Sequence, residues 1–416
     1  MGKKYIDNTW DFRKDNTKEY THCYHSYPAM MIPQVARRLI DKYGKKAKRL
    51  FDPYCGTGTS LVEANIKNIN AIGTDLNPLA RLIAEAKTTP IDLRKLDTCI
   101  RDFSDKAFSA QFGVKAPKTI ELPDFKNIDY WFSKDVQEKL ALIKNYIDNI
   151  QDESIQKFFK VAFSETVREC SWTKNSEFKL VRMSAEQMKR FNPNVYSIME
   201  FKLSRNRKGL ESYLQIKQNG ATAEIYDFNT VTKIPIDILP TNSIDLIVTS
   251  PPYGDSRTTV AYGQFSRLAN QWLGDQGASH VDKSLMGGIK NGNRIKSRNK
   301  AANETIAKIY DIDENRCKDV IAFFADYEKS ISNLADTIKP GGYACYVVGN
   351  RTVKGITIPT DEITKEFFET NGFKHIETII RSIPNKRMPS ENSPSNVRGE
   401  KASTMKNEYI VICQKK

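Results

Sequence analysis

Hydrophobic and polar positions between about residues 28 and 95 predict helices and strands in alternation. Apolar residues recur at helical spacing after Pro33, and proline is typical of a first helical turn. Short apolar runs at 49–51 and 71–74 have the length of strands, and a second helical pattern from Leu61 separates them. The order strand, helix, strand predicts a βαβ unit with a right-handed crossover.

The pattern changes after residue 95, where apolar residues follow helical spacing alone. They recur in steps of three and four around Leu140 and Phe158, and a basic run follows at 205–208. We therefore predict a mainly helical insertion over 96–214, which could have a small core of its own.

Strand patterns return beyond the insertion. Apolar runs occupy 223–226 and 244–248, and a long helical pattern extends from Val320 to Ile338. The sequence Lys-Pro-Gly-Gly at 339–342 signals the end of that helix, and a strand-like run at 343–348 follows it. Strands that alternate with helices indicate an α/β fold with a mostly parallel sheet.

The last two β-rich runs, 373–380 and 409–413, are predicted to pair as a terminal antiparallel hairpin. We accordingly divide the chain into three parts. Residues 1–95 hold an N-terminal segment and one half of the α/β domain, 96–214 form the insertion, and 215–416 supply the other half.

Composition limits the class of protein. The 416 residues are 39% hydrophobic, and the apolar runs are spread along the length, which suffices for a full core. The formal net charge of +14 favours a polyanionic partner, because clustered Lys and Arg release condensed counterions on binding. No run approaches the roughly 18 apolar residues that span a bilayer, and the N-terminus lacks the apolar core of a secretion signal. We expect a cytoplasmic protein without a membrane segment.

The cysteines and histidines form no metal signature. Seven cysteines include no C-x-x-C pair, and Cys23, between His22 and His25, is accompanied by no second ligand cluster. We predict free, mostly buried thiols in a reducing compartment and no metal site.

A glycine-rich turn at 52–59, Asp-Pro-Tyr-Cys-Gly-Thr-Gly-Thr, lies where a strand changes to a helix. Gly56 and Gly58 have no Cβ, so the backbone can bend sharply and a ligand can approach it closely. Asp75 ends the following strand, where a carboxylate can accept both hydroxyl hydrogens of a ribose. Together they predict a site for an adenosine-containing ligand, and the alternative is a tight turn without one.

Two features that are missing from the turn argue against a dinucleotide and against a nucleoside triphosphate as the ligand. A dinucleotide site would have a small residue where Leu61 stands, and no Gly-Lys-Ser/Thr follows to form a P-loop. S-adenosylmethionine has no phosphate and fits the turn better, with Asp52 placed to meet its ammonium group.

A second motif, Ser250-Pro251-Pro252-Tyr253, follows the strand-like run that ends at Val248. The two prolines fix φ and leave carbonyls in set directions. The Ser250 hydroxyl oxygen and the Pro251 carbonyl could accept both hydrogens of an exocyclic base amine, so that the nitrogen lone pair faces a methyl donor. Tyr253 offers a π-face for the base, which must be flipped out of a duplex to reach it. The alternative is a Pro-Pro turn that merely ends a strand.

These motifs resemble the cofactor and catalytic motifs of the S-adenosylmethionine-dependent amino-methyltransferases that modify DNA bases. The resemblance rests on the glycine-rich turn, Gly73 to Asn77, Ser250 to Tyr253 and the final strand from Asn407. It rests more weakly on His25 to Ala29 and on Asp227. It covers somewhat more than half of the chain. Ser-Pro-Pro-Tyr is similar to the form typical of the cytosine-N4 branch, whereas the adenine-N6 branch usually has Asp or Asn in first place.

The resemblance implies a Rossmann-like, seven-stranded, mostly parallel sheet with a terminal antiparallel hairpin and a largely helical insertion. It assigns the cofactor half to residues 1–95 and the catalytic half to 215–416, and it makes 96–214 a candidate target-recognition region. The implied catalytic residues are Ser250, Pro251, Pro252 and Tyr253. The implied cofactor-binding residues are Pro28, Asp52, Pro53, Cys55, Gly56, Thr57, Gly58, Thr59, Asp75, Leu76, Asn77, Asp227 and Phe228.

The order of the motifs departs from many cytosine-N4 enzymes, in which the catalytic motif comes first. Here it comes second, with over 170 residues between Asp75 and Ser250. That order is compatible with an inserted target-recognition region. It is also the order of tRNA guanine-N2 methyltransferases, which usually have Asp-Pro-Pro-Tyr.

Basic residues after the catalytic motif are candidates for phosphate contacts, and a solvated loop is the alternative. They are Lys283, Lys290, Arg294, Lys296, Arg298 and Lys300. Trp172 and Phe178 could stack on bases, although such aromatics are more often part of a core.

We therefore expect a site-specific DNA-methyltransferase, cytosine-N4-specific, that acts on a flipped base in double-stranded DNA. It would belong to a restriction-modification system with a cognate restriction endonuclease, or act alone. The alternatives are adenine-N6 methylation of DNA, guanine-N2 methylation of tRNA and a non-catalytic nucleic-acid-binding protein. The sequence leaves the recognition sequence, the partner nuclease and the oligomeric state open.

Overall fold

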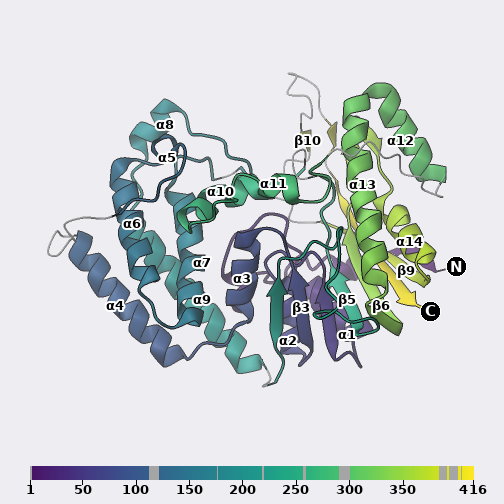
Figure 1. Cartoon of the computed structure of the whole chain (residues 1–416), viewed down its shortest axis with the longest axis horizontal. Coiled ribbons are helices and arrows are strands. Elements are labelled where there is room, and N and C mark those ends of the chain that lie inside the picture. Colours follow the sequence, from purple (N-terminus) through teal and green to yellow (C-terminus); the bar gives the residue numbers. More distant parts are fainter. Residues whose placement is uncertain are drawn as a thin grey trace.

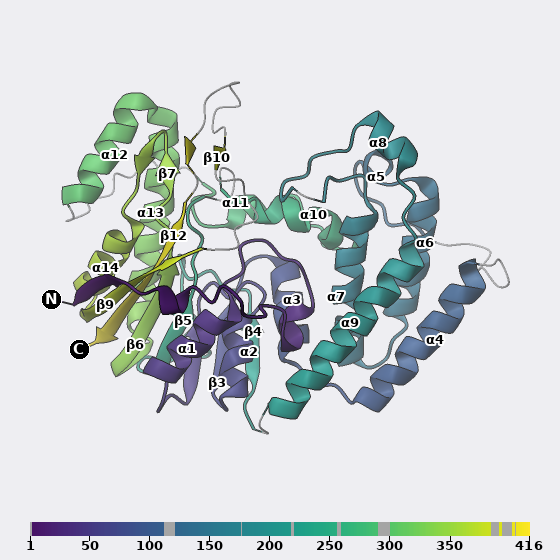
Figure 2. The same ribbon diagram turned by 180° about the vertical axis from the view of Figure 1, so that it is seen from behind.

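The computed structural model describes residues 2–111, 121–175, 177–217, 220–255, 259–289, 300–383, 391–392, 402–403 and 405–416. A central sheet carries helices on both faces, and a further group of helices lies beside it (Figure 1). The view from behind shows the N-terminal strand at the side of the sheet remote from that helical group (Figure 2).

Within the described residues eight strands form the main sheet, one more than the seven expected. The extra strand is β1 (Lys3–Ile6), which pairs in parallel with β9 (Phe373–Ser382) at the edge. All four β1 side chains are exposed, so no hydrophobic pattern marks this strand in the sequence. The order continues with β12 (Asn407–Lys415), β6 (Ile338–Val348), β5 (Ile244–Thr249), β2 (Arg49–Asp52), β3 (Asn70–Thr74) and β4 (Ala223–Tyr226).

The C-terminal strand β12 lies antiparallel between β9 and β6. Tyr409 of β12 stands opposite Ile380 of β9 and Val348 of β6. The other neighbouring pairs of the described sheet are parallel. The predicted pairing of the two C-terminal runs and the mostly parallel α/β class are therefore confirmed.

Helices bury both faces of the sheet, as a mostly parallel sheet requires. On one face α1 (Pro33–Tyr43) and α2 (Thr59–Ile66) pack against Leu50 and Leu246 of β2 and β5. On the other face α13 (Glu314–Ala335) and α14 (Thr360–Thr370) contribute to the hydrophobic core that contains Phe51 of β2. The order α1, β2, α2, β3 confirms the predicted βαβ unit.

The long C-terminal helix ends earlier than its apolar pattern suggested. α13 stops at Ala335, and Ile338 already begins β6, opposite Ile244 of β5. The Lys-Pro-Gly-Gly segment, 339–342, lies inside β6, where the pairing register shifts. Ile338 is apolar because it is a buried strand residue, and helical spacing alone could not distinguish the two states.

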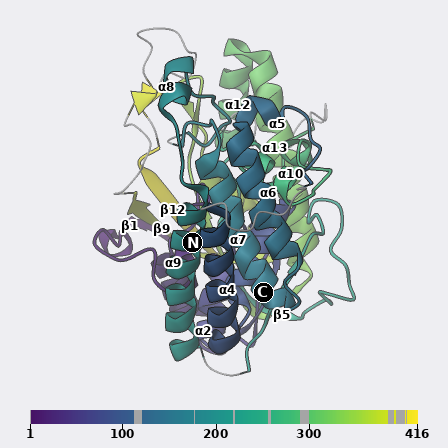
Figure 3. The same ribbon diagram turned by 90° about the vertical axis from the view of Figure 1, so that its left-hand side faces the viewer.

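The insertion is largely helical, as predicted. It contains α4 (Leu93–Gln111), α5 (Ile128–Trp131), α6 (Lys134–Asp148), α7 (Glu153–Cys170), α8 (Ala185–Arg190) and α9 (Val195–Ile216). The side view shows these helices in front of the sheet (Figure 3).

Two helices from outside the insertion enter the same core. They are α3 (Pro78–Thr88) and α10 (Tyr262–Trp272), and Trp272 is fully buried there with its ring edge-on to Phe132 and Phe163. The helical core is therefore continuous with the α/β domain rather than separate from it.

Smaller elements complete the described chain. They are η1 (Asn8–Trp10), η2 (Tyr20–Cys23), α11 (Val281–Ser284), α12 (Lys300–Ile312), β7 (Thr352–Val353), β8 (Ile356–Thr357), β10 (Glu391–Asn392) and β11 (Ala402–Ser403). All seven cysteines are free thiols, and six are buried. Across the described ranges, no three metal-ligating side chains cluster and no helix has the length and apolarity to cross a membrane.

Candidate active site

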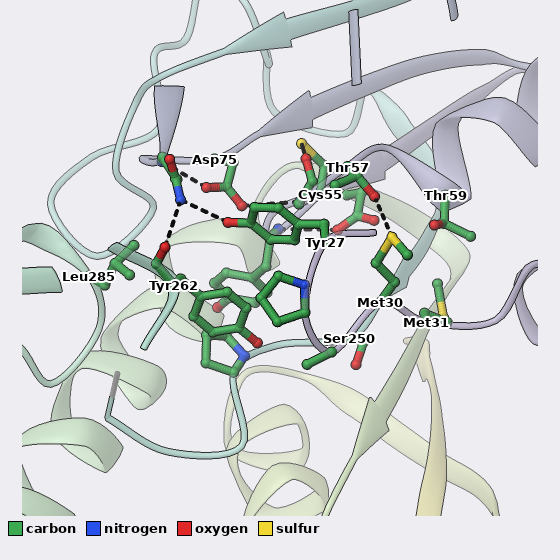
Figure 4. Close-up of a pocket in the computed structure, with 17 residues that line it drawn as sticks. Tyr27, Met30, Met31, Cys55, Thr57, Thr59, Asp75, Ser250, Tyr262 and Leu285 are labelled. Atoms are coloured by element: carbon green, nitrogen blue, oxygen red, sulfur yellow. Dashed lines mark hydrogen bonds between the residues drawn. The ribbon is translucent and has the colours of Figure 1, made fainter. Parts of the chain in front are cut away.

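A cavity opens where β2, β3 and β5 end, at the edge of an α/β sheet where ligands commonly bind. It measures about 670 Å³ when its open mouth is included. The glycine-rich turn, the Ser-Pro-Pro-Tyr loop and the chain before α1 converge on it (Figure 4). Its described lining is Tyr27, Pro28, Ala29, Met30, Met31, Asp52, Tyr54, Cys55, Gly56, Thr57, Thr59, Asp75, Asn77, Ser250, Pro252, Tyr262 and Leu285. Two motifs far apart in the sequence thus share one cavity.

The turn after β2 bends at two glycines with positive φ, Gly56 at +50° and Gly58 at +74°. A Cβ at Gly56 would meet no protein atom within 4 Å, so the backbone there borders open space. A Cβ at Gly58 would lie 2.9 Å from Cβ of Ala84 in α3, closer than carbon atoms pack. Gly56 therefore leaves room beside the backbone, and Gly58 allows the turn to lie against α3.

Asp75, directly after β3, ties the glycine-rich turn to α3. Its Oδ2 accepts a hydrogen bond from the N–H of Gly56 at 3.0 Å, and its Oδ1 accepts one from the N–H of Asn77 at 2.8 Å. Burial raises the pKa of Asp75, whereas the two N–H donors favour the charged form. Each carboxylate oxygen keeps a lone pair with which it can accept a hydroxyl hydrogen of a ligand.

Asp52, the last residue of β2, joins the two motifs. Its Oδ1 accepts a hydrogen bond of 2.5 Å from the hydroxyl of Thr249, the residue before Ser250. Its Oδ2 accepts a hydrogen bond from the hydroxyl of Ser60 in α2. Burial raises the pKa of Asp52 to about 6, although the hydroxyl donors favour the charged form. A cation in the cavity would bind this carboxylate strongly, because the interior screens charge poorly.

Ser250 lines the cavity, and its hydroxyl hydrogen points toward β6 rather than into the cavity. Oγ lies 3.1 Å from the carbonyl oxygen of Val347 in β6 and 3.3 Å from the hydroxyl of Tyr253. Because a carbonyl oxygen only accepts, Ser250 is the donor in that pair, and its own lone pairs stay available. Pro252 lines the cavity beside it, whereas Pro251 and Tyr253 are not part of the described lining. The Tyr253 hydroxyl donates to Glu408 in β12, so this hydroxyl is directed toward the sheet.

Tyr27 and Tyr262 form an aromatic wall that we did not predict. Their rings stack with centroids 6.0 Å apart and planes inclined by 20°. The Asn77 amide nitrogen donates to the Tyr27 hydroxyl at 2.8 Å and to the Tyr262 carbonyl at 3.5 Å. Tyr262 begins α10 and Leu285 follows α11, so neither belongs to a motif. Their position soon after Ser-Pro-Pro-Tyr is the one signal that could have suggested them.

The chain before α1 closes another side of the cavity. Pro28, which we had assigned to the cofactor site, lines it together with Met30. The preceding residues are anchored in the helical insertion, where the N–H of Ser26 donates to Glu165 of α7 at 3.1 Å. Arg205 of α9 binds the other oxygen of the same carboxylate at 2.8 Å. The insertion therefore holds one wall of the cavity in place.

Other predicted cofactor-binding residues lie outside the cavity. Asp227 follows β4 with its side chain 79% exposed and 3.9 Å from Arg81. Phe228 packs on the ring of Phe51, with centroids 6.3 Å apart. The segments that border the cavity also include Pro53, Gly58 and Leu76, which do not themselves line it. A cofactor contact of these residues stays a prediction.

The predicted phosphate contacts are partly outside the described chain. Lys283 is exposed in α11, and Lys300 opens α12. Lys290, Arg294, Lys296 and Arg298 lie outside the described residues. Trp172 is half-buried, with the guanidinium of Arg182 over its ring, and Phe178 packs against the helical core. Both contacts favour a structural role for these aromatic residues over stacking on bases. Contact of the lysines and arginines with DNA stays a prediction.

Comparison with known proteins gives three informative similarities. The model of the DNA methylase family N6_N4_Mtase matches residues 1–85. The Type II methyltransferase M.MvaI of Kocuria varians is 40% identical over 433 aligned positions, which cover 99% of this chain and 95% of that protein. A tRNA (guanine(10)-N2)-dimethyltransferase of Methanothermobacter thermautotrophicus is 40% identical over 52 residues, 12% of this chain and 16% of that protein.

The contact between Gly58 and α3 leads to a stability prediction. We expect Gly58→Ala to lower the free energy of unfolding by about 2–4 kcal/mol, because strain at positive φ adds to overlap with Ala84. Gly341 is the matched control, since its φ is +79° and a Cβ there would meet no atom within 4 Å. Gly341→Ala should cost about 1 kcal/mol. Urea unfolding measures both, and equal losses would show that the overlap with α3 costs nothing.

Proposed function

Because the chain belongs to the DNA methylase family of amino-methyltransferases, we propose that it methylates N4 of a cytosine in a specific DNA sequence, with S-adenosylmethionine as methyl donor. The observation that carries the proposal is the convergence of the glycine-rich turn and Ser250 on one cavity. We assign the enzyme to a restriction-modification system, as the Type II name of its relative from Kocuria varians suggests.

The donor set of the cavity fits S-adenosylmethionine. Asp75 offers lone pairs to ribose hydroxyls, Asp52 offers a buried carboxylate to an ammonium group, and Gly56 borders open space. Tyr27 and Met30 supply apolar surface. When bound, the cofactor supplies a methyl group already activated on a sulfonium, so the protein need not form a covalent intermediate.

The residues of the catalytic motif orient the target amine. Ser250 gives its own hydrogen to Val347, so its oxygen accepts one hydrogen of the amine. We assign the second amine hydrogen to the carbonyl of Pro251, which the proline pair holds in a fixed direction. With both hydrogens held, the nitrogen lone pair turns toward the methyl donor, and this fixed orientation replaces a random encounter.

Cytosine N4 is favoured over adenine N6 by the serine of Ser-Pro-Pro-Tyr. A cytosine inside a duplex cannot reach the cavity, so we infer that the enzyme flips its target base out of the stack. The insertion at 96–214 is our candidate for the region that reads the DNA sequence. Lys283, exposed near the cavity, is a candidate for a phosphate contact.

Nucleoside analysis tests the proposed reaction. We expect N4-methylcytosine when the protein is incubated with labelled S-adenosylmethionine and unmethylated DNA, and no label in tRNA. Mass spectrometry of digested nucleosides identifies the product. Detection of N6-methyladenine would change the assigned base from cytosine to adenine. Label in tRNA alone would indicate a tRNA methyltransferase, like the relative from Methanothermobacter thermautotrophicus.

Removal of the Ser250 hydroxyl tests its assigned role. We expect Ser250→Ala to keep the Kd of S-adenosylmethionine within about twofold and to lower kcat by about 100-fold, because an orienting contact to the reacting amine is lost. Calorimetry and single-turnover methylation measure the two quantities. Unchanged turnover in this variant would remove Ser250 from the mechanism.

The raised pKa of Asp52 predicts that cofactor affinity depends on pH. Below about pH 6 the free protein holds Asp52 neutral, whereas a cationic ligand favours the carboxylate. The Kd of S-adenosylmethionine should therefore rise by about tenfold as the pH falls from 7.5 to 5. Burial lowers the pKa of His22 and of His25 to about 4, so they do not titrate in this range.

Asp52→Asn is the control for that dependence. It should weaken binding at pH 7.5 and flatten the change of Kd with pH, because no proton is then exchanged at this position. The same pH dependence in this variant would assign the titration to another group.

A further inference from the structure

A partly buried chain of hydrogen bonds runs from Ser250 through Tyr253 and Glu408 to Arg381 in β9. The Tyr253 hydroxyl lies 3.0 Å from Oε1 of Glu408, which is in β12. The other oxygen of Glu408 accepts a hydrogen bond from the guanidinium of Arg381, its partner across the strand pair in β9. The Ser250 hydroxyl lies 3.3 Å from the Tyr253 hydroxyl at the other end of the chain.

Arg381 is itself fixed by the N-terminal segment. Only 4% of its side chain is exposed, and its guanidinium donates to the carbonyl of Trp10 at 2.8 Å and to the carbonyl of Asp11 at 3.3 Å. Three acceptors therefore hold this cation in one orientation. Glu408 is presented to Tyr253 from a rigid position rather than from a mobile surface.

The direction of each hydrogen bond in this chain follows from the chemistry of the groups. A carboxylate oxygen can only accept, so the hydrogen between Tyr253 and Glu408 belongs to Tyr253. The Tyr253 hydroxyl therefore has no hydrogen left to give to Ser250. In their 3.3 Å contact Tyr253 can only accept a share of the one Ser250 hydrogen, for which the Val347 carbonyl at 3.1 Å is the nearer acceptor. Burial and the Glu408 charge raise the pKa of Tyr253 well above 10, so the hydroxyl keeps its hydrogen at neutral pH.

We propose that Glu408 is a positioning residue that keeps Ser250 an acceptor toward the target base. By taking the hydrogen of Tyr253, Glu408 prevents that hydroxyl from donating to the Ser250 oxygen. The Ser250 lone pairs then remain free for a hydrogen of the base amine. An amine carries such hydrogens and a ring carbonyl does not. This set of hydrogen bonds therefore favours amino groups over carbonyl oxygens as targets. This inference rests on the proposed function of Ser250.

The variant Glu408→Gln is expected to reverse the direction of the hydrogen bonds between residue 408, Tyr253 and Ser250. The Arg381 donors would hold the amide oxygen, so the amide NH₂ would face Tyr253 and turn the tyrosine hydrogen toward Ser250. We expect kcat to fall by about tenfold, the worth of one hydrogen bond, with the Kd of S-adenosylmethionine and the KM for DNA within about twofold. A fall in kcat without a change in binding is not expected from general loosening of the sheet.

Tyr253→Phe shows whether Glu408 acts through the tyrosine hydroxyl. Phenylalanine keeps the ring and leaves Ser250 to donate to Val347. We expect Glu408→Gln to change kcat by less than about twofold when it is added to Tyr253→Phe, because no hydroxyl is left to reverse. If Glu408→Gln acted by loosening the fold, it would reduce activity equally in the wild type and in Tyr253→Phe. That result would overturn the proposal.

Glu377 provides a matched control. It lies in β9, accepts hydrogen bonds from the hydroxyls of Tyr5 and Tyr43, and is not part of the described cavity lining. Glu377→Gln disturbs a tyrosine–carboxylate contact of the same kind, and we expect kcat to stay within about twofold of the wild type.

The outcomes separate this inference from the proposed function. A wild type that transfers no methyl group to DNA refutes the proposed function and this inference with it. An active wild type in which Glu408→Gln leaves kcat unchanged, or lowers it equally with and without the Tyr253 hydroxyl, refutes the inference alone.

Discussion

The hydrogen bond from Thr249 to Asp52 is the contact on which the arrangement of the site depends. Asp52 ends β2, Thr249 ends β5, and the two strands are parallel neighbours in the sheet. Each residue directly precedes or begins its motif, so the alignment of two strands also aligns the glycine-rich turn with Ser250. The same carboxylate is buried and carries a raised pKa, so one side chain both joins the motifs and supplies negative charge to the cavity.

Much of this arrangement could be predicted from local sequence. The βαβ unit, the β5 strand and the pairing of β9 with β12 follow from apolar patterns, and the two motifs follow from turn chemistry. Tyr262, Leu285 and Glu408 could not be predicted in the same way. Each reaches the site through packing of elements distant in the chain, and a single tyrosine or glutamate in an amphipathic segment carries no signal of its neighbours.

Errors in the prediction have the same origin. The exposed residues of β1 join the sheet by backbone pairing and by polar contacts such as that of Tyr5 with Glu377, so no apolar pattern could indicate the eighth strand. The helical insertion shares its core with α3 and α10, although its apolar pattern is complete in itself. The ion pairs of Glu165 and Arg205 then connect that core to the cavity wall at Ser26. Contacts between segments that are far apart in the sequence decide these features. The spacing of apolar residues describes only one segment at a time.

The position of β1 has a consequence for how such genes can be arranged. β1 and β12, which contain residues from the two ends of the chain, both pair with β9, so the ends lie on the same side of the sheet (Figure 1). Linking them and cutting the chain elsewhere would preserve every strand neighbour, as circular permutation requires. The two motifs meet through the sheet rather than along the backbone. The order of the two motifs can therefore change in the gene while the cavity that they share is kept.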